Sequence, residues 1–210
     1  MMQTSAMFCA CLATLGLLTT AALGGDDRLY EGVFAPNTSF IRVVAPGAQF
    51  AAVDGHRLPT EDLVISAYVN VAPGEVAVDL AATAVPVPVA ANLHYTVLVH
   101  DSGAHAVITD DLQASPAKAD VTFYNLSDQA GVTLFAPAAS AAVFEDVAPQ
   151  TGAAMALRAP LTLTFEARAA GVTLAAAEAV ALRRKEGVSL VLTGAAGVYE
   201  LSASPHRYQK

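Results

Sequence analysis

The sequence predicts an all-β protein made of two tandem antiparallel β-sandwich (Ig-like) domains that follow a cleaved signal peptide. Three observations favour this fold: apolar and polar residues alternate with a period of two, turn signals recur at short intervals, and two stretches of the chain resemble each other. The composition agrees, because 54% of the 210 residues are hydrophobic and 14% are charged, against about 25% charged in an average globular protein. Sparse charge of this kind is typical of β-rich exported proteins.

Residues 1–24 have the composition of a secretory signal peptide. They contain no Asp, Glu, Lys or Arg, and the run Ala6–Leu18 is almost wholly apolar. That run is shorter than the ~20 apolar residues of a membrane span, and Ala22-Leu23-Gly24 fits a small-residue cleavage site. We therefore expect an exported mature chain with no stable membrane span. Cys9 and Cys11 lie inside this segment, so we expect no disulfide and no thiolate metal site in the mature protein.

Alternating residues mark the expected strands. Val76–Leu80 and Leu161–Ala167 alternate between apolar and small or polar side chains, which places one face of each strand in a core. Val85–Val89 alternates valine with proline, and proline has no N–H to donate, so we predict an edge strand whose prolines face away from the paired neighbour. The Ala-rich stretch Leu174–Arg184 is the one helix candidate, and its neighbours favour a strand.

Two stretches match in order and indicate a duplicated unit. Each opens with an apolar strand, continues through a Val-Ala-Pro turn and closes with a strand before a glycine. The first stretch has Phe40–Val44, Val71-Ala72-Pro73-Gly74, Tyr95–Val99 and Gly103. The second has Val121–Asn125, Val147-Ala148-Pro149-Gln150, Val188–Leu192 and Gly197. We interpret them as a tandem duplication of one β-sandwich unit.

The polar stretch Asp110–Pro116 separates the two units. We predict an N-terminal sandwich over residues 25–112 and a C-terminal sandwich over residues 117–210, each of a normal size for about seven strands. Charge divides at the same place: residues 25–115 hold three Arg and eleven acids, whereas residues 116–210 hold eight basic and eight acidic residues. The first half is therefore acidic. A nucleic-acid partner is excluded, since phosphate binding needs clustered Lys and Arg.

No catalytic or metal site emerges from the residue patterns. His94 and His100 are six residues apart on one expected strand, which separates them by about 20 Å, so they cannot share a metal. His100-Asp101-Ser102 has the letters of a catalytic triad, but neighbours on a strand point to opposite faces. The sequence contains no Gly-x-Ser-x-Gly elbow. We expect no enzyme activity, no catalytic residue, no metal and no cofactor.

Two short motifs allow two interpretations each. Arg183-Arg184-Lys185 is the one basic run, and it either decorates a turn or makes a weak contact with an anionic polymer. Asn37-Thr38-Ser39 and Asn125-Leu126-Ser127 match the glycosylation sequon. Their Asn and Ser side chains could equally bond local backbone groups in turns.

Four strings, in order, resemble the AlgF family, periplasmic accessory proteins of alginate O-acetylation. The strings are Leu29-Tyr30 with Ala35-Pro36 and Ser39–Val43, then Tyr95–Val99, then Val121–Asp128, and finally Leu190–Gly194. Together they extend over nearly the whole chain beyond the signal segment. The stretches Ala48–Leu63 and Ala136–Ala159 match the family pattern poorly.

The resemblance implies a non-catalytic periplasmic adaptor in the O-acetylation of an alginate-like exopolysaccharide. Such an adaptor would bridge a membrane acyltransferase and the SGNH-like periplasmic enzymes that acetylate the polymer, and it could also touch the polymer. The partner-binding candidates within the matching strings are Leu29, Tyr30, Phe40, Arg42, Asn125 and Ser127. An N-terminal arm carrying Leu29 and Tyr30 suits a partner groove, or it folds back on its own domain. The alternative function is a generic exported β-sandwich module that binds carbohydrate or cell-surface components.

Overall fold

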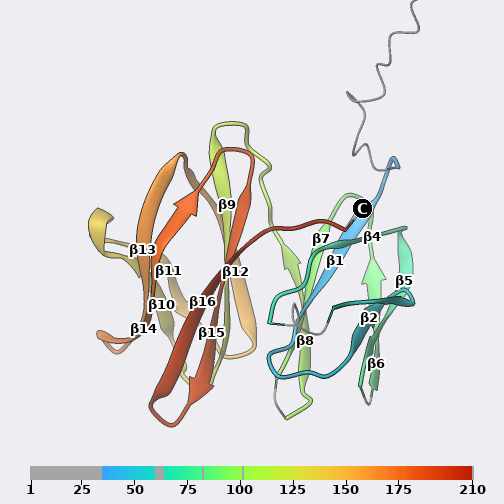
Figure 1. The fold of residues 1–210 in the computed structure, drawn as a ribbon, viewed down its shortest axis with the longest axis horizontal. Coiled ribbons are helices and arrows are strands. Elements are labelled where there is room, and N and C mark those ends of the chain that lie inside the picture. Colours follow the sequence, from blue (N-terminus) through green and yellow to red (C-terminus); the bar gives the residue numbers. More distant parts are fainter. Residues whose placement is uncertain (1–34, 60–63, 82, 101, 210) are drawn as a thin grey trace, which may run out of the picture. The chain divides into compact units, whose positions relative to one another are not determined.

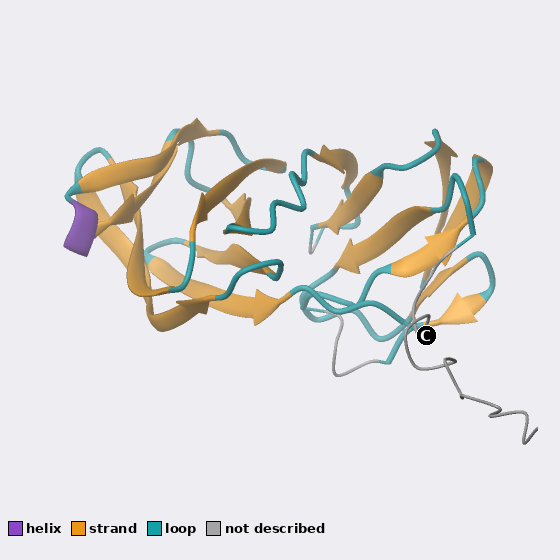
Figure 2. Cartoon of the chain, turned by 90° about the horizontal axis from the view of Figure 1, so that it is seen from above, coloured by secondary structure: helices purple, strands orange, loops and turns teal. Residues whose placement is uncertain are grey.

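Strands account for nearly all the regular structure in the computed structural model, which describes residues 35–59, 64–81, 83–100 and 102–209 (Figures 1 and 2). The first eight are β1 Ser39–Val44, β2 Ala51–Val53, β3 His56–Arg57, β4 Val69–Val71, β5 Gly74–Leu80, β6 Thr83–Val89, β7 His94–Val99 and β8 His105–Asp110. The others are β9 Lys118–Ser127, β10 Val132–Ala136, β11 Ala141–Val147, β12 Thr151–Arg158, β13 Leu161–Ala169, β14 Val172–Leu182, β15 Gly187–Ala195 and β16 Val198–Pro205. A short 3₁₀ turn, η2, covers Pro137–Ala139.

The all-β prediction is confirmed for the described residues. The predicted signal peptide at 1–24, and Leu29 and Tyr30, lie outside them. No helix within the described ranges has the length and apolar character that crossing a membrane requires. The Ala-rich helix candidate belongs to strand β14.

Four four-stranded sheets make up the fold, consistent with two β-sandwiches. In the first half the sheets have the orders β4-β1-β7-β8 and β3-β2-β5-β6, and in the second half β12-β9-β15-β16 and β11-β10-β13-β14. Adding eight to each strand number converts the first pair of sheets into the second. This identity of topology supports the duplication. The Ig-like assignment and the domain limits at 112 and 117 stay predictions.

The strand equivalences correct two sequence-based expectations. The sheets are not wholly antiparallel, because β1 pairs with β7 in parallel and β9 pairs with β15 in parallel. The two Val-Ala-Pro turns are also not equivalent. The first connects β4 to β5 and the second connects β11 to β12, so the topological counterpart of Ala72-Pro73 is Ala159-Pro160 between β12 and β13. The closing glycines do correspond, since Gly103 and Gly197 lie in the β7–β8 and β15–β16 turns and both have positive φ.

Outer and inner sheets have different burial patterns. In β5, Val76 and Val78 are buried and Ala77 between them is exposed, as the alternation predicts. The inner strands β1, β7, β9 and β15 each contain four or more consecutive buried residues. Burial at consecutive residues means that both faces of these strands are covered.

Each half has its own hydrophobic core, and a third cluster joins them. Ile41 and Val43 belong to the core of the first half, and Phe123 and Leu190 to that of the second. The third cluster combines side chains from both halves: Val44, Ile65, Leu98, Tyr124, Leu126 and Val191, with Ile108 packed against them. The inner sheets of the two halves therefore pack on each other through the faces opposite their cores.

Strand β6 ends its sheet, as the prolines predict. It pairs with β5 alone, and Pro86 and Pro88 are exposed positions between buried valines. Their nitrogens point to the same side of the strand because the two positions are two residues apart. Neither proline nitrogen can donate a hydrogen bond, yet β6 pairs with β5 along both prolines. The side of β6 on which these nitrogens lie is therefore its free edge.

Candidate functional site

A network of buried polar side chains lies between the two inner sheets and is centred on Arg42. The Arg42 side chain is 1% exposed. Its Nε donates to Thr96 Oγ1 at 2.9 Å, and its Nη2 donates to Tyr124 Oη at 2.7 Å and to Thr122 Oγ1 at 3.2 Å. The guanidinium also lies over the Tyr68 ring, 4.3 Å from its centroid. Arg42 thus binds side chains of both halves at once.

Asp110 supplies the negative charge of this network. Its Oδ2 lies 3.7 Å from Arg42 Nη2 and accepts hydrogen bonds from Thr96 Oγ1 at 2.6 Å and Tyr68 Oη at 2.9 Å. Its Oδ1 accepts a further bond from the Tyr124 hydroxyl. A buried ion pair is best tolerated when its remaining donors and acceptors are satisfied, and these contacts engage both oxygens of Asp110 and the Nε and Nη2 of Arg42.

Strand geometry explains why Arg42 points between the sheets. Successive side chains of a strand face opposite sides, so Ile41 and Val43 enter the first core and Arg42 faces the second half. Burial alone lowers the pKa of Arg42. The oxygens of Tyr124, Tyr68 and Asp110 outweigh that effect, and the net pKa is raised. Burial raises the pKa of both tyrosines, which therefore stay protonated and can donate.

The chain beyond β16 reaches back to the first half. Tyr68 N donates to Arg207 O at 2.7 Å, and Gln209 N donates to Tyr68 O at 2.8 Å. The Tyr208 ring stacks on Tyr68 with centroids 5.2 Å apart and meets Phe40 edge-on at 5.2 Å. Residues 206–209, called the tail below, thereby add a parallel bridge next to β4.

A Ser–His couple, absent from the sequence-based expectations, lies at the end of the network. Ser189 Oγ is 2.9 Å from His206 Nε2, and Ser189 is 1% exposed. The couple joins β15 to the tail and continues to Thr122, whose Oγ1 is 2.6 Å from Ser189 Oγ. The two residues are far from His100-Asp101-Ser102 in the sequence, and only the fold brings them together.

The surroundings of this couple make the imidazole a weak base. Burial, reinforced by the charge of Arg42 and by His94, lowers the pKa of His206 to about 2, whereas a general base works best with a pKa near the operating pH. The His206 ring also packs on Gly187, where a Cβ would lie 2.0 Å from Nδ1. Ser189 and His206 therefore connect β15 to the tail, and the serine hydroxyl and the imidazole Nε2 bond each other in that contact.

The structure places the predicted partner-binding residues in three settings. Leu29 and Tyr30 lie outside the described residues. Phe40 is half-buried and stacks on His94, with ring centroids 4.7 Å apart. Arg42, Asn125 and Ser127 are fully buried. A partner could reach these three only if surrounding side chains moved, and partner binding by any of the six residues stays a prediction.

Asn125 and Ser127 fix the turn after β9. Asn125 Nδ2 donates to Gln129 O at 2.8 Å and Val147 O at 3.0 Å, while its Oδ1 accepts from Ser127 Oγ at 2.7 Å. Asp128 then accepts a bond from Ala196 N at 3.0 Å in the β15–β16 turn. Asn125 and Ser127 therefore do bond local backbone groups, but they do so at the end of strand β9 and not in a turn.

The histidines do not form a metal site in the described part of the chain, where no group of three or more His, Cys, Asp or Glu could hold a metal. His94 packs among Phe40, Tyr68 and Tyr208, and His100 bonds Ser102 in the β7–β8 turn, with 3.1 Å between Nδ1 and Oγ. Burial lowers the pKa of His94.

Comparison with known proteins relates the chain to alginate acetylation. The family model described as "Alginate O-acetyl transferase AlgF" matches residues 12–185. The alginate biosynthesis protein AlgF of Pseudomonas syringae pv. tomato (strain ATCC BAA-871 / DC3000) is 30% identical over 124 residues, which are 58% of this chain and 56% of that protein. The chain thus matches about half the length of this curated relative.

One solved structure is similar over part of the chain. It is the C-terminal domain of AlgF from P. aeruginosa, which has 26% sequence identity and a TM-score of 0.38. The match covers 43% of this chain and 99% of the solved domain.

Proposed function

The chain belongs to the AlgF family, and from this premise we propose that it is a non-catalytic periplasmic adaptor for O-acetylation of an alginate-like exopolysaccharide. The adaptor would hold a membrane acyltransferase close to the periplasmic enzymes that place acetyl groups on the polymer. The observation that carries the proposal is the family match, which extends over residues 12–185.

The polar groups of the interior support a binding role over a catalytic one. The Ser189–His206 couple has a base whose pKa is about 2 and a hydroxyl that bonds Thr122 inside the protein. Tyr68 and Tyr124 both donate to Asp110, and Arg42 donates to Tyr124 and lies 3.7 Å from Asp110. Groups used in this way stabilise a scaffold, and sandwiches bind partners through their edges and end loops.

Deletion of the gene tests the proposal. Polymer made by the deletion strain should lose its acetyl groups while its yield persists, because an accessory protein of acetylation is not needed for chain synthesis. Acetyl content is measured by proton NMR of the purified polymer. Restoring the gene on a plasmid should restore acetylation. Unchanged acetyl content in the deletion strain would reject the proposal.

A variant separates the adaptor from a catalyst. Ser189→Ala removes the hydroxyl that lies 2.9 Å from His206 Nε2 but keeps the size of the side chain nearly constant. An adaptor carrying Ser189→Ala should support full acetylation, provided that its melting temperature stays close to that of the natural protein. Loss of acetylation by a well-folded Ser189→Ala protein would instead indicate a covalent role for the hydroxyl.

A carbohydrate-binding module is distinguished by titration. If the protein is such a module, calorimetry with purified alginate or other polymers should give a saturable heat. If it is an adaptor that acts through proteins, the polymer alone should give none, whereas the deletion strain should still lose acetylation.

A further inference from the structure

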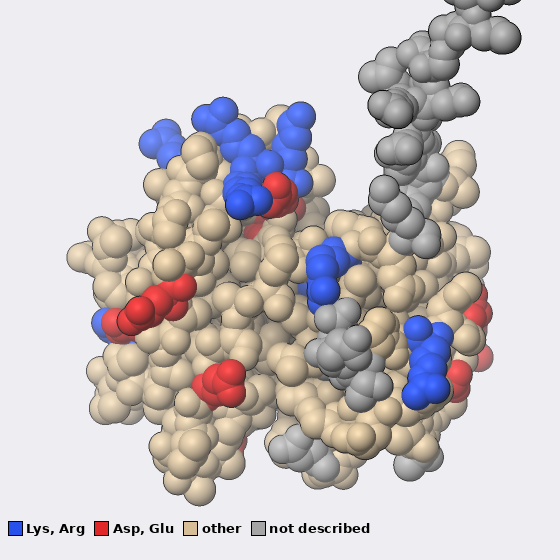
Figure 3. Space-filling model, viewed as in Figure 1, with Lys and Arg blue, Asp and Glu red and all other residues tan. Residues whose placement is uncertain are grey.

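Most charged side chains of the second half are separated toward its two ends. Four exposed acids lie where β9 and β11 finish and β16 begins: Asp128, Glu145, Asp146 and Glu200. Five exposed cations, called the basic end below, gather at the opposite end, where β9 begins and β12 and β14 finish: Lys118, Arg158, Arg183, Arg184 and Lys185. Figure 3 shows Lys and Arg side chains gathered at the top of the second half.

Contacts between neighbouring strand ends hold the basic end together. Lys118 pairs across the sheet with Arg158, and Lys185 N donates to Lys118 O at 3.0 Å. Arg184 Nε donates to Ala159 O at 3.0 Å. The cations therefore come from three neighbouring segments and form one surface.

Three acids next to the basic end reduce its charge. Glu186 lies 3.9 Å from Arg183, with both side chains more than half exposed, and an exposed pair of this kind contributes little. Asp120 accepts a bond from Gln113 N, and Asp111 accepts one from the Gln113 side chain. Five cations beside three acids leave an excess of positive charge, in a protein whose net charge is −8.

An exposed apolar side chain lies among these cations. Leu161 is 42% exposed and begins β13, three residues after Arg158. It pairs with Leu182, which directly precedes Arg183, and Leu161 and Arg183 line one hollow of the surface. An exposed apolar residue surrounded by cations is typical of proteins that lie on an anionic membrane surface.

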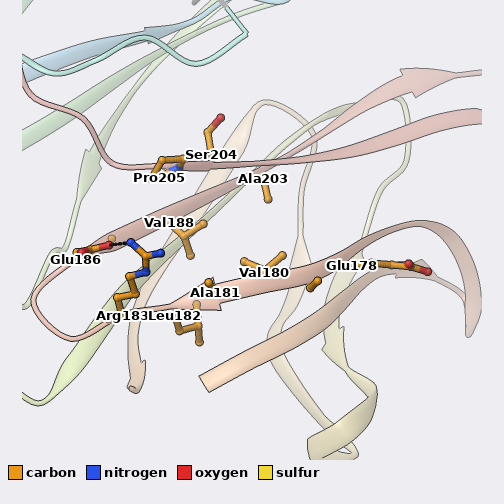
Figure 4. Close-up of a pocket in the computed structure, with 13 residues that line it drawn as sticks. Glu178, Val180, Ala181, Leu182, Arg183, Glu186, Val188, Ala203, Ser204 and Pro205 are labelled. Carbon is orange, nitrogen blue, oxygen red and sulfur yellow. Dashed lines mark ion pairs between the residues drawn. The ribbon is translucent and has the colours of Figure 1, made fainter. Parts of the chain in front are cut away.

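The neighbouring groove between β14 and β16 does not suit an anionic chain. It has a volume of about 360 Å³, and two carboxylates, Glu178 and Glu186, are among its lining residues (Figure 4). A polymer or peptide with repeated negative charge would meet both of them. Residues 111–118, 158–162 and 183–187 contain no Phe or Tyr, so the basic end also offers no ring that could stack on a sugar.

The length of the second half keeps the two kinds of charge apart. β9 runs from the basic end to the acidic end in ten residues, which correspond to about 33 Å. The Debye length is about 8 Å at physiological ionic strength, so a negative surface that touches the basic end is screened from the acids of the other end. Local charge therefore outweighs net charge at this surface.

We propose that the basic end docks on the anionic phospholipid surface of a membrane, with its cations on lipid phosphates and Leu161 among the headgroups. Each Lys or Arg near such a surface strengthens binding about fivefold. The contact is peripheral, because loops and strand ends make it. The inference rests on the adaptor function, since it names the surface that would hold the adaptor beside its membrane acyltransferase.

Co-sedimentation with lipid vesicles tests the docking. The protein is purified after export, and the fraction that lacks the apolar run Ala6–Leu18 is used, because that run would itself bind lipid. It should sediment with vesicles of equal parts phosphatidylcholine and phosphatidylglycerol, and not with phosphatidylcholine alone. Raising the salt from about 0.1 M to about 1 M shortens the Debye length to about 3 Å and should release the protein. Absence of binding to the anionic vesicles would overturn the proposal.

A single tryptophan reports which end meets the lipid. The chain contains no Trp, so Leu161→Trp places the only one at the basic end, and its emission should shift to the blue when anionic vesicles are added. Val198→Trp is the matched control, because Val198 is 79% exposed at the other end of the second half. Its emission should stay unchanged. Equal shifts in both variants, or a shift in Val198→Trp alone, would overturn the proposed site.

Charge variants measure the contribution of the cations. Arg158→Gln and Lys185→Gln should each lower the vesicle partition coefficient about fivefold. Arg57→Gln is the matched control, because it removes a cation from an exposed position of the first half, and it should leave the coefficient unchanged. Equal weakening by Arg57→Gln would mean that only net charge matters, and the basic end would then not be the docking surface.

The remaining outcomes separate the surface from the function. A soluble polyuronate that releases the protein from vesicles at matched salt, and shifts the emission of Leu161→Trp, would identify a general polyanion site and reject the lipid proposal. Loss of acetylation in the deletion strain, without vesicle binding by the protein, would keep the adaptor and reject this surface. Vesicle binding with normal acetylation in that strain would keep the surface and reject the adaptor.

Discussion

Arg42 makes several of the polar contacts between the two halves, so its loss should be costly. Arg42→Met keeps much of the side-chain volume but leaves Asp110 buried without its cation. Removal of one partner from a buried ion pair costs about 3–5 kcal/mol. We expect the free energy of unfolding, measured with urea, to fall by that amount. Arg57→Met, at an exposed arginine, should change it by less than about 0.5 kcal/mol. A loss below about 1 kcal/mol for Arg42→Met would contradict the role described here.

His206 should make stability depend on pH. The unfolded chain protonates this histidine near pH 6.5, whereas burial keeps the folded side chain neutral down to a pKa of about 2. The unfolded state therefore binds more protons throughout that window, and stability falls as the pH drops below 6.5. The free energy of unfolding should decrease by about 1 kcal/mol for the first pH unit. His94, whose pKa burial also lowers, acts in the same direction.

His206→Gln removes that titration and should flatten the dependence on pH. His105→Gln is the control, because His105 is exposed, and its variant should follow the natural protein. The measurement is urea unfolding at intervals between about pH 7 and pH 4, within the titration window of a histidine. A steep curve that persists in His206→Gln would assign the effect to other groups.

At the residue scale, the sequence did not show the environment of the predicted partner-binding residues. Arg42, Asn125 and Ser127 stand in strings that resemble the AlgF family, and all three prove to be buried. The partners of Arg42 come from β7, β8 and β9 and from Tyr68 before β4. Contacts between residues so far apart in the chain depend on the tertiary fold, and no local pattern contains them. The available sign of this buried network in the sequence was a single arginine, Arg42, within an otherwise mostly apolar strand.

At the scale of elements, Pro86 and Pro88 protect the free edge of β6. The double variant Pro86→Val/Pro88→Val restores two N–H groups on that edge and raises β propensity, so the strand becomes a template for pairing with another chain. We expect concentration-dependent association, measured by light scattering, with little change in the melting temperature. Ala84→Val adds a β-branched residue at an exposed position of the same strand, frees no N–H, and should leave the protein dispersed.

The sequence predicted strands correctly where one strand face is exposed to solvent, and it predicted them incompletely where both faces are buried. β5 and β6 alternate in the sequence and alternate in burial. β1 and β7 are mostly apolar, interrupted by Arg42 and Thr96, and consecutive apolar residues are typical of strands buried on both faces. These residues were the available sign of a second layer. The parallel pairing of β1 with β7 was missed because it joins strands separated by five others.

At the scale of the whole molecule, the shared interface should make the two halves unfold together. The third hydrophobic cluster and the Arg42 network both combine residues of the two halves. Differential scanning calorimetry should show one transition whose calorimetric and van't Hoff enthalpies agree. Arg42→Met should separate it into two transitions. Two transitions in the natural protein would show that the halves are energetically independent.

The duplication was predictable from the sequence only in outline. Opening and closing strands were matched correctly, but the Val-Ala-Pro turns were not, because three-residue strings recur by chance and topology distinguishes them. The packing of the inner sheets on each other was not predicted. This packing uses the strand faces that point away from the core of their own half, and Val44 and Leu126 lie on such faces.

The parallel strand pairs have a consequence for how the newly made chain acquires its structure. Phe40 meets His94, and Asp120 meets Gly187, so one edge of each opening strand stays unpaired until most of that half has been synthesised, while the other edge pairs with β4 or β12. Chains dominated by such distant pairings fold in milliseconds to seconds. During this delay the opening strands remain accessible to chaperones and proteases, and the folding rate, rather than final stability, should govern how much protein accumulates.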